Sequence, residues 1–371
     1  MQRPQQHQAG RSAPTITDVA QRAGVSMKTV SRVLNDEPNV QPQMRQRVMA
    51  AVAELDYRPN MYARSLARSR SYLLGLLYFS ASAEFVGGVQ RGATARCREL
   101  GYHLVVEPLD DDAAGVEQQL RHMMSALRPD GLILVPPVCD NATVLATLAD
   151  ARMPCVLISP GRPPPGVAHV SMDDTLAAAE MTSFLLGQGH RRIGFIEGAL
   201  TQAAAPRRRA GYLAALRAAG VPVDDQLIVP GDFRFRSGQE GCDRLLALAD
   251  PPTAVFASND DMAMGAVVAA HRRGLQVPGD LSVAGFDDSP LATLVWPQLT
   301  TVRQPVAQMA AAAVDRLVLR TTGAAAPGSN GSGGVAQPDG SQDPKGDSAP
   351  GPQVLPYELI ERASTAAPRR R

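Results

Sequence analysis

The hydrophobic pattern divides the chain into two regions. Before residue 60, apolar positions recur every three or four residues in segments 15–24, 26–35 and 42–57, which is the spacing of amphipathic helices. From residue 72 onward, short apolar runs alternate with longer helical patterns. Strands that alternate with helices are typical of parallel sheets covered on both faces. We therefore predict a small all-α domain followed by an α/β core.

The core is long enough for two doubly wound parallel-sheet subdomains, at about 100–200 residues per domain. The predicted strands lie at 73–79, 102–108, 130–137, 154–160, 167–172, 192–198, 226–231, 253–259, 281–288, 299–305 and 354–362. We assign the first subdomain to about 72–170 plus 302–321, and the second to about 171–301 plus 354–363. Ligands of such sheets bind beyond the carboxyl ends of the strands, so a cleft between the subdomains is the expected site.

The first two helical segments carry the signals of a helix-turn-helix motif. Thr15 and Asp18 have the spacing of a helix-capping pair, and Gly24 stands where helices commonly end. Ser26 can cap the second helix after a very short turn. Two short helices joined by a turn with glycine are typical of this motif, so we predict a DNA-binding domain at 15–59.

The second of these helices presents polar residues beside its apolar face. Met27 and Lys28 occupy its first turn, where a recognition helix meets base edges in the major groove. Lys28 can donate to guanine, Met27 can pack on a thymine methyl, and Arg32 can reach a base or a phosphate. Short donors suited to phosphate oxygens are Thr17, Ser26, Thr29 and Ser31. The alternative is a small helical bundle with polar caps.

The charge distribution also favours a nucleic-acid partner for the first region. Residues 1–70 hold 11 Lys or Arg and 5 Asp or Glu, whereas the whole chain has a net charge of +1. A basic end on an acidic body suggests a nucleic-acid module, although a solvated basic tail has the same composition. Residues 1–14 are polar and lack the apolar segment of a secretion signal, so we predict a disordered leader there.

Residues 60–71, between the two regions, can form a hinge helix that folds only on DNA. Asn60 can cap this helix, which is too short to be stable alone. Leu66 is an apolar residue of the kind that wedges into a minor-groove step. The predicted minor-groove contacts are Asn60, Ala63, Arg64, Leu66, Ala67 and Arg68. A plain interdomain linker is the alternative.

Polar residues follow several predicted strands, where a ligand is expected. Asn259 and Asp287 each follow an apolar run, Arg208 opens a helix, and Phe233 lies in a loop. Amides and carboxylates bind vicinal hydroxyls, arginine donates paired hydrogen bonds, and a phenyl ring packs on the apolar face of a sugar. We therefore expect a carbohydrate effector. The alternative is that Asn and Asp cap the following helices. Capping or surface roles are favoured for Asp260, Asp261 and Asp288.

Several motifs of the first region resemble the DNA-binding headpiece of the LacI/GalR family of bacterial transcription regulators. They are TITDVAQRAGVSMKTVSRVLN at 15–35, LDYRPN at 55–60 and ARSL at 63–66. The resemblance implies a homodimer whose two headpieces bind a pseudo-palindromic operator in double-stranded DNA. It also implies that Leu66 of both chains intercalates at the operator centre. Met27 and Lys28 fall where the family varies its base-reading pair.

The resemblance extends over residues 72–321 and implies a core similar in fold to periplasmic sugar-binding proteins. Its motifs are GHRRIGFIEG at 189–198, SNDDMAMGA at 258–266 and LSVAGFDDSPLATLVWPQLTTVRQP at 281–305. Carried over residue by residue, it implies effector contacts at Arg208, Phe233, Asn259, Asp287 and Gln304. The segment YFSASAEF at 78–85 differs from the family's common D-x-x-N-P-F-F form, and Ser82 and Phe85 are the candidates there. Ser159 stands at a strand end where many relatives carry Asp.

The remaining segments set limits on the function. Residues 322–353 are rich in Gly, Ser, Pro and Asp, so we predict a disordered insertion, and 364–371 form a tail. No heptad repeat of the family's tetramer-forming kind follows, so a dimer is expected. The 4 cysteines are far apart and form no CxxC, so neither a metal site nor a cofactor is expected. No apolar run approaches the ~18 residues of a membrane span.

The sequence thus predicts a cytoplasmic, nucleoid-associated regulator that binds DNA in a sequence-specific manner. We expect a repressor of carbohydrate-utilisation genes that a sugar inducer releases from its operator. A regulator that needs a corepressor such as a purine is the main alternative, and a solute-binding protein without gene control is another. Motifs of serine hydrolases, zinc proteases and P-loop enzymes are absent from the sequence, so an enzyme is not expected.

Overall fold

The computed structural model describes residues 14–34, 37, 40–57, 70–79, 83–110, 115–322 and 351–369. The chain forms two compact units, Met1–Tyr72 and Leu73–Arg371. Most of the predicted leader, hinge helix and insertion lies outside the described residues. Within the part that the structure describes, no helix is long and apolar enough to cross a membrane.

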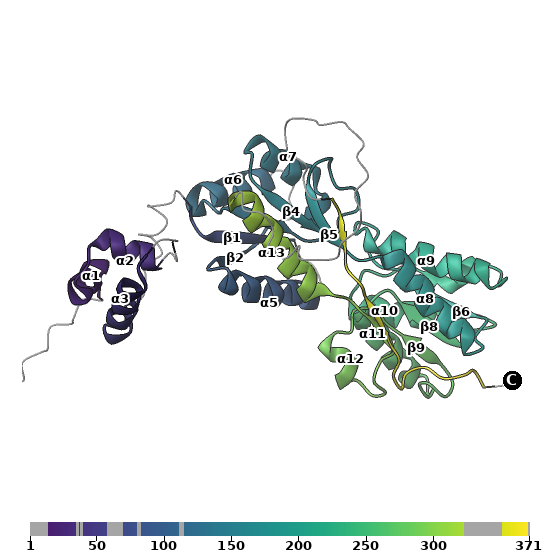
Figure 1. The fold of residues 1–371 in the computed structure, drawn as a ribbon. Helices are drawn as coiled ribbons and strands as arrows, with labels where there is room; N and C mark the ends of the chain where they lie inside the picture. The colour runs from purple at the N-terminus through teal and green to yellow at the C-terminus, as the bar shows by residue number, and fades with distance from the viewer. Residues whose placement is uncertain are drawn as a thin grey trace, which may run out of the picture. The chain divides into compact units, whose positions relative to one another are not determined.

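The described residues of the smaller unit form three helices around one apolar core (Figure 1). They are α1 Ile16–Ala23, α2 Met27–Leu34 and α3 Pro42–Glu54. Val19, Val30 and Val48, one from each helix, are fully buried and pack together. The third helix ends three residues before the predicted boundary, because Leu55 already serves as its C-terminal cap.

The turn between α1 and α2 is fixed by the residues expected to cap it. Thr15 and Asp18 form a reciprocal capping box at the start of α1. Gly24 adopts a left-handed conformation with φ of 63°, which favours glycine. The Ser26 hydroxyl accepts a hydrogen bond from the Thr29 amide at 3.2 Å, as a helix cap does. The Arg47 side chain of α3 donates to the Ala23 carbonyl at 2.6 Å and so ties α3 to this turn.

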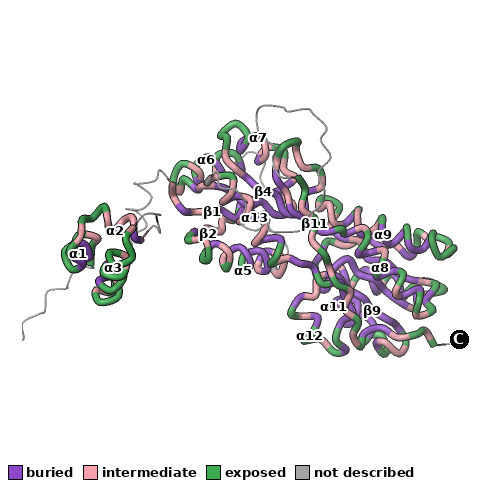
Figure 2. The backbone as a smooth tube through the Cα atoms, viewed as in Figure 1, coloured by how far each residue is buried: buried purple, intermediate pink, exposed green. Residues whose placement is uncertain are grey.

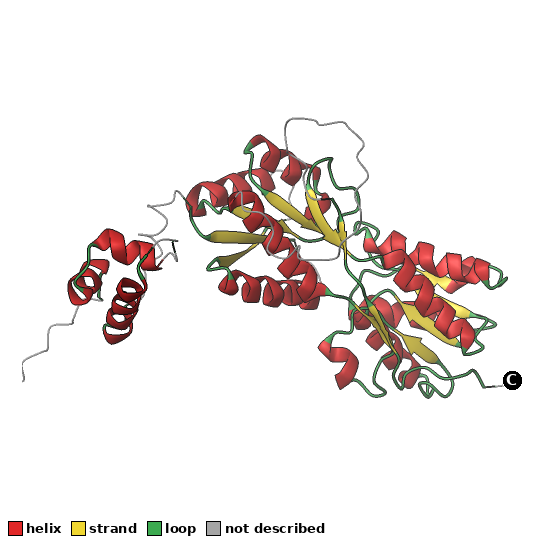
Figure 3. Cartoon of the chain, viewed as in Figure 1, coloured by secondary structure: helices red, strands yellow, loops and turns green. Residues whose placement is uncertain are grey.

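The larger unit contains two lobes, each a parallel sheet between helices (Figure 3). The N-lobe sheet has the order β11-β5-β4-β3-β1-β2, and all its pairings are parallel. Its strands are β1 Leu73–Tyr78, β2 His103–Pro108, β3 Gly131–Leu134, β4 Cys155–Ile158, β5 Ala168–Ser171 and β11 Gln353–Val354. Its helices are α5 Ala83–Glu99, α6 Val116–Leu127, α7 Ala142–Asp150 and α13 Val306–Thr322. Helices α6 and α7 share one apolar cluster with the strands, whereas α5 and α13 pack on each other.

The C-lobe repeats this plan with a smaller sheet of order β7-β6-β8-β9. Its strands are β6 Ile193–Ile196, β7 Ile228–Val229, β8 Ala254–Ala257 and β9 Ser282–Ala284. Its helices are α8 Asp174–Gly187, α9 Ala204–Ala218, α10 Phe235–Leu246, α11 Asp260–Arg272 and the short α12 Pro290–Leu294. Side chains alternate between the two faces, so Phe256 packs under α8 and α9 while Val255 packs under α10 and α11. Figure 2 shows the buried positions concentrated on the strands and on the helix faces turned toward them.

The strand pairing moves two of the predicted lobe boundaries. Strand β10, Thr301–Arg303, is bridged to the end of the C-lobe sheet and pairs with β12, Glu358–Ile360. The chain therefore enters the N-lobe only after Arg303. The predicted strand at 354–362 is divided between β11 in the N-lobe sheet and β12 beside the C-lobe. Pro356 stands between them, and its missing amide hydrogen interrupts a ladder at that position.

Residues 364–369, expected as a tail, pack against the C-lobe. The Ser364 carbonyl accepts a hydrogen bond from the Val283 amide at 2.8 Å, and the Ser364 hydroxyl donates to the Val283 carbonyl at 2.6 Å. The buried His190 ring contacts the Ala366 carbonyl at 2.9 Å. This segment is polar and lacks strand periodicity, so its place beside β9 depends on tertiary contacts.

Candidate DNA-binding surface and candidate ligand cavity

The first turn of α2 is the most exposed part of that helix. Met27 is 54% exposed and Lys28 is also exposed, whereas Val30 and Val33 on the opposite side are buried. The Thr17 hydroxyl lies 3.5 Å from the Met27 sulfur and connects α1 to this surface. The helix thus presents the residues expected to face base edges, and their contact with DNA stays a prediction.

Arg32 extends along α2 to a carboxylate. Its Nε lies 3.2 Å from Glu37 Oε2, and its side chain is 39% exposed. A pair this exposed contributes little to stability, so a phosphate oxygen can replace the carboxylate at low cost. The predicted hinge contacts, Asn60, Ala63, Arg64, Leu66, Ala67 and Arg68, lie outside the described residues.

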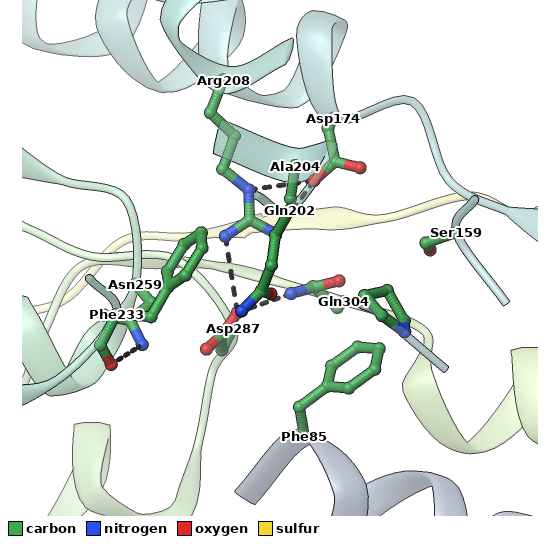
Figure 4. Close-up of a pocket in the computed structure, with 11 residues that line it drawn as sticks. Phe85, Ser159, Asp174, Gln202, Ala204, Arg208, Phe233, Asn259, Asp287 and Gln304 are labelled. Carbon is green, nitrogen blue, oxygen red and sulfur yellow. Dashed lines mark hydrogen bonds and ion pairs between the residues drawn. The ribbon is translucent and has the colours of Figure 1, made fainter. Parts of the chain in front are cut away.

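A cavity lies between the N-lobe and the C-lobe (Figure 4). It gathers the predicted effector residues Phe85, Ser159, Arg208, Phe233, Asn259, Asp287 and Gln304. Ser82, the remaining candidate, lies outside the described residues. Four further lining residues were not singled out from the sequence: Pro136, Asp174, Gln202 and Ala204.

Arg208 is the most firmly held side chain of this cavity. It is buried, and its guanidinium pairs with the buried Asp174 carboxylate at 2.9 Å. One Nη also donates to the Ser258 carbonyl at 2.5 Å. The Phe286 ring centroid lies 3.6 Å from the guanidinium carbon. A guanidinium with its position fixed by these contacts keeps its orientation before any ligand arrives.

Asp287 faces Arg208 across the cavity. Its carboxylate lies 3.9 Å from Arg208 Nη1 and accepts a 2.5 Å hydrogen bond from the Gln304 amide. Burial raises the pKa of Asp287 to about 8, against the opposing effect of Arg208. Its φ of 130° lies in a region that L-residues rarely adopt. An unusual backbone at a cavity wall is a common mark of a functional position.

Asp260 is buried and holds neighbouring segments together, which differs from the capping or surface role favoured from the sequence. Its carboxylate accepts hydrogen bonds from the Thr301 hydroxyl at 2.6 Å and the Ser289 amide at 2.8 Å. Burial raises its pKa to about 7, and these hydrogen bonds act in the opposite direction. Asp260 and Asp287 also disfavour each other's charge, so this pair of carboxyls favours protonation of one of them.

Asn259 both lines the cavity and caps α11. Its Oδ1 accepts from the Met262 amide at 3.0 Å, and its Nδ2 donates to the Phe233 carbonyl at 2.9 Å. The capping alternative therefore holds, and contact with a ligand stays a prediction. Phe233 has a φ of 67°, and its ring lies only 2.0 Å from the position of a Cβ on Gly198. Only glycine at 198 leaves room for this ring.

The N-lobe side of the cavity is formed by Pro136 together with two further residues. They are Phe85 and Ser159 (Figure 4). Ser159 directly follows β4 and is buried, with a φ of 49°. Its hydroxyl lies 3.9 Å from the Met309 sulfur. This wall therefore offers rings and a small hydroxyl, while the charged groups all come from the opposite lobe.

One direct hydrogen-bonded contact crosses between the lobes at the cavity rim. Arg207 of α9 donates to the carbonyls of Pro160 and Gly161 in the N-lobe, at 2.7 and 3.2 Å. Asp140 holds the same loop by accepting from the Gly161 amide at 2.7 Å. A Cβ on Gly161 would lie 2.9 Å from the Ala203 Cβ of the C-lobe. We name this set the Arg207 contact.

A helix-turn-helix unit on a two-lobed α/β core with a cavity between the lobes defines a ligand-responsive DNA-binding regulator. Comparison with known families agrees with this class. Residues 15–60 match the model for bacterial regulatory proteins of the lacI family, and residues 182–332 match that for a periplasmic binding protein-like domain. The chain belongs to the lacI family of bacterial regulatory proteins.

Similar proteins include catabolite control protein A of Priestia megaterium, which is 36% identical over 81% of this chain and 90% of the relative. The ribose operon repressor of Escherichia coli K12 is 35% identical, over 83% of this chain and 93% of the relative. A lac repressor dimer bound to operator and the anti-inducer ONPF has a TM-score of 0.73 and 29% identity, covering 96% of this chain and 100% of that one. The predicted family, fold class and regulatory rather than enzymatic function are confirmed.

Proposed function

We propose that this regulator is a homodimeric repressor whose α2 helices bind operator DNA until a sugar occupies the cavity between the lobes. The observation that carries the proposal is the set of fixed polar groups around that cavity, Arg208, Asp287 and Gln304, beside the Phe233 ring. Similar structures include a regulator bound to cellobiose and the operator-bound lac repressor dimer. A protein with this function works in the cytoplasm, on the nucleoid.

The proposed DNA contacts follow from the exposure of α2. In a helix-turn-helix dimer, each recognition helix enters the major groove and the half-sites are about one helical turn apart. Met27 and Lys28 would contact bases, and Thr17, Ser26, Thr29, Ser31 and Arg32 would contact the backbone or flanking bases. The predicted hinge helix would complete the interface in the minor groove.

The cavity chemistry favours a sugar over other small molecules. The Asp287 carboxylate and the Gln304 amide can accept and donate hydrogen bonds to vicinal hydroxyls. Arg208 donates from a fixed position, and Phe233 and Phe85 offer apolar faces to a ring. We expect the sugar to bind more tightly to the conformation with low DNA affinity, because only differential affinity shifts a conformational equilibrium.

A purine corepressor is the second candidate. The same two phenyl rings can stack on a flat base, and the HTH-type transcriptional repressor PurR of Erwinia tasmaniensis is 36% identical over 83% of this chain. In this case the ligand would tighten DNA binding rather than release it. The sign of the response therefore separates the two candidates.

The experiment is fluorescence anisotropy of labelled DNA from upstream of the protein's own gene, titrated with the full-length protein at fixed salt. Fixed salt is essential because phosphate contacts make the affinity steeply salt-dependent. We expect at least one of a panel of neutral sugars to raise the Kd for DNA tenfold or more, which is about 1.4 kcal/mol. If purine bases alone act, and they tighten binding, the corepressor alternative replaces the proposal.

A further inference from the structure

A second cavity adjoins the proposed effector cavity and shares part of its wall. It is lined by residues of both lobes. The shared residues are Phe85, Asp287 and Gln304. The remaining polar lining includes Glu84 and Arg91 from α5, and Asp288 and Arg303 from the C-lobe side. The two cavities are thus neighbours separated by three side chains.

The residues that separate the two cavities come from different lobes and can therefore move apart. Phe85 belongs to α5 of the N-lobe, whereas Asp287 follows β9 and Gln304 follows β10 beside the C-lobe. Gln304 reaches the boundary with its side-chain amide, which donates to Asp287 at 2.5 Å. Separation of the lobes, or rotation of Gln304, would join the two spaces into one groove. A ligand that extends past Gln304 would enter the second cavity.

The second cavity carries balanced charges. The Arg91 guanidinium pairs with Glu84 at 2.9 Å, and the Arg303 guanidinium pairs with Asp288 at 2.7 Å. The Arg91 side chain is 66% exposed and the Arg303 side chain is 48% exposed, so both can also donate to a ligand. The two ion pairs carry no net charge, and Asp287 adds a third carboxyl to the lining, so the cavity gives no net attraction for an anionic ligand. A neutral ligand rich in hydroxyls can instead accept from the guanidiniums and donate to the carboxylates.

We infer that the effector is a neutral disaccharide whose two rings occupy the two cavities. The first ring lies among Arg208, Asp287 and Phe233, and the second lies against Arg91 and Glu84. Phe85, which lines both cavities, packs at the linkage between the rings. This inference rests on the proposed function and adds to it the size and neutrality of the ligand.

The test compares two ligand sizes with two protein variants by isothermal titration calorimetry of the full-length protein. The probes are glucose and galactose, together with cellobiose, maltose, lactose and melibiose. We expect one disaccharide to bind at least tenfold more tightly than either of its component monosaccharides. Arg91→Ala should weaken that disaccharide about tenfold, the effect of about one charge-assisted hydrogen bond, and change monosaccharide affinity less than twofold.

The matched control is Arg121→Ala. Arg121 lies on α6 of the same lobe, pairs with Glu117 at 2.8 Å and is 50% exposed, but lines neither cavity. We expect this variant to bind both ligand sizes as the unaltered protein does. Glu84→Gln provides a second variant that keeps the side-chain volume, and it should also weaken only the disaccharide.

The outcomes separate this inference from the function on which it rests. If monosaccharides bind as tightly as disaccharides, or if Arg91→Ala and Glu84→Gln weaken both sizes equally, the two-ring assignment is wrong while the sugar-responsive repressor stands. If a purine binds and no sugar of either size does, the proposed function fails and this inference fails with it. Tighter binding of glucose 6-phosphate than of any neutral disaccharide would overturn the neutral-ligand assignment.

Discussion

The two lobes contribute to the effector cavity in different ways. On the C-lobe side, Arg208 is held by Asp174, Ser258 and the Phe286 ring, and Asp287 is held by Gln304. On the N-lobe side, Phe85, Pro136 and Ser159 provide rings and one small hydroxyl. The C-lobe therefore carries a preorganised polar surface. The N-lobe forms the opposite wall of the cavity, and its contribution to ligand affinity depends on closure of the two lobes. The difference suggests that recognition and conformational response are divided between the lobes.

The largest effect on stability is expected from a substitution in the polar surface of the C-lobe. Arg208→Ala leaves the buried Asp174 carboxylate without its partner at 2.9 Å. Removal of one member of a buried ion pair costs about 3–5 kcal/mol, so the free energy of unfolding should fall by that amount. Urea unfolding followed by circular dichroism measures it.

Arg209→Ala is the matched control for this prediction. Arg209 is the next residue on α9, and its pair with Glu197 at 2.9 Å leaves its side chain 42% exposed. A pair this exposed is worth at most about 1 kcal/mol. Equal destabilisation by the two variants would contradict the fixed role of Arg208.

A smaller effect is expected from Gly198→Ala, which displaces the Phe233 ring. The new Cβ would lie 2.0 Å from the Phe233 ring, so the ring must move. Overpacking of this kind costs about 1–3 kcal/mol. Thermal unfolding measures the stability, and titration calorimetry should show a weaker effector affinity. Gly187→Ala, where a Cβ meets no atom within 4 Å, should leave both quantities nearly unchanged or slightly raise the stability.

Substitution of Arg207 tests the contribution of the N-lobe wall rather than that of the polar surface of the C-lobe. Arg207→Ala removes the hydrogen bonds to Pro160 and Gly161 in the other lobe, while α9 keeps its own core contacts. We expect the effector affinity to fall about fivefold to tenfold, or about 1 kcal/mol, with little change in stability. Arg209→Ala again serves as the control. A loss of stability as large as that of Arg208→Ala would mean that Arg207 stabilises the fold instead of the closed state.

The last prediction gives the direction of a pH dependence. The folded pKa values of Asp260 and Asp287, about 7 and about 8, lie above the ordinary value of 3.8. A carboxyl with a raised folded pKa stabilises the protein most below its unfolded pKa, and this contribution is lost as pH rises toward 8. The free energy of unfolding should therefore fall as the pH rises from 5 to 8. Asp287→Asn should reduce the pH dependence of the free energy of unfolding, measured by urea titration at each pH. An unchanged pH dependence would mean that other groups cause it.

The three arginines of α9 show what the sequence can and cannot predict. Arg207, Arg208 and Arg209 are chemically identical and adjacent, yet they contact the opposite lobe, the cavity and Glu197 respectively. Arg208 is predicted from the sequence because it opens a helix after a loop and falls on a position to which the family resemblance assigns effector contact. Arg207 has no local signal, since its partners are backbone carbonyls far away in the chain.

Local patterns predicted the strands, the helix caps and the residues that follow strand ends, because these depend on spacing within a few residues. Asp174 was missed because it follows Asp173, which caps α8, and a second acidic residue in a first turn has an ordinary explanation. Pro136, Gln202 and Ala204 reach the cavity from turns or helix starts whose direction is set by tertiary packing. The division of 354–362 between two sheets likewise depends on long-range strand pairing.

The central claim is that occupation of the cavity controls DNA binding. The most direct test is anisotropy of operator DNA with the unaltered protein and with Asp287→Ala, each titrated with the sugar that releases the unaltered protein. We expect Asp287→Ala to bind DNA with the same Kd and to remain bound as sugar is added, while its circular dichroism spectrum is unchanged. Release of Asp287→Ala at the same sugar concentration as the unaltered protein would contradict the assignment of this cavity as the sensor.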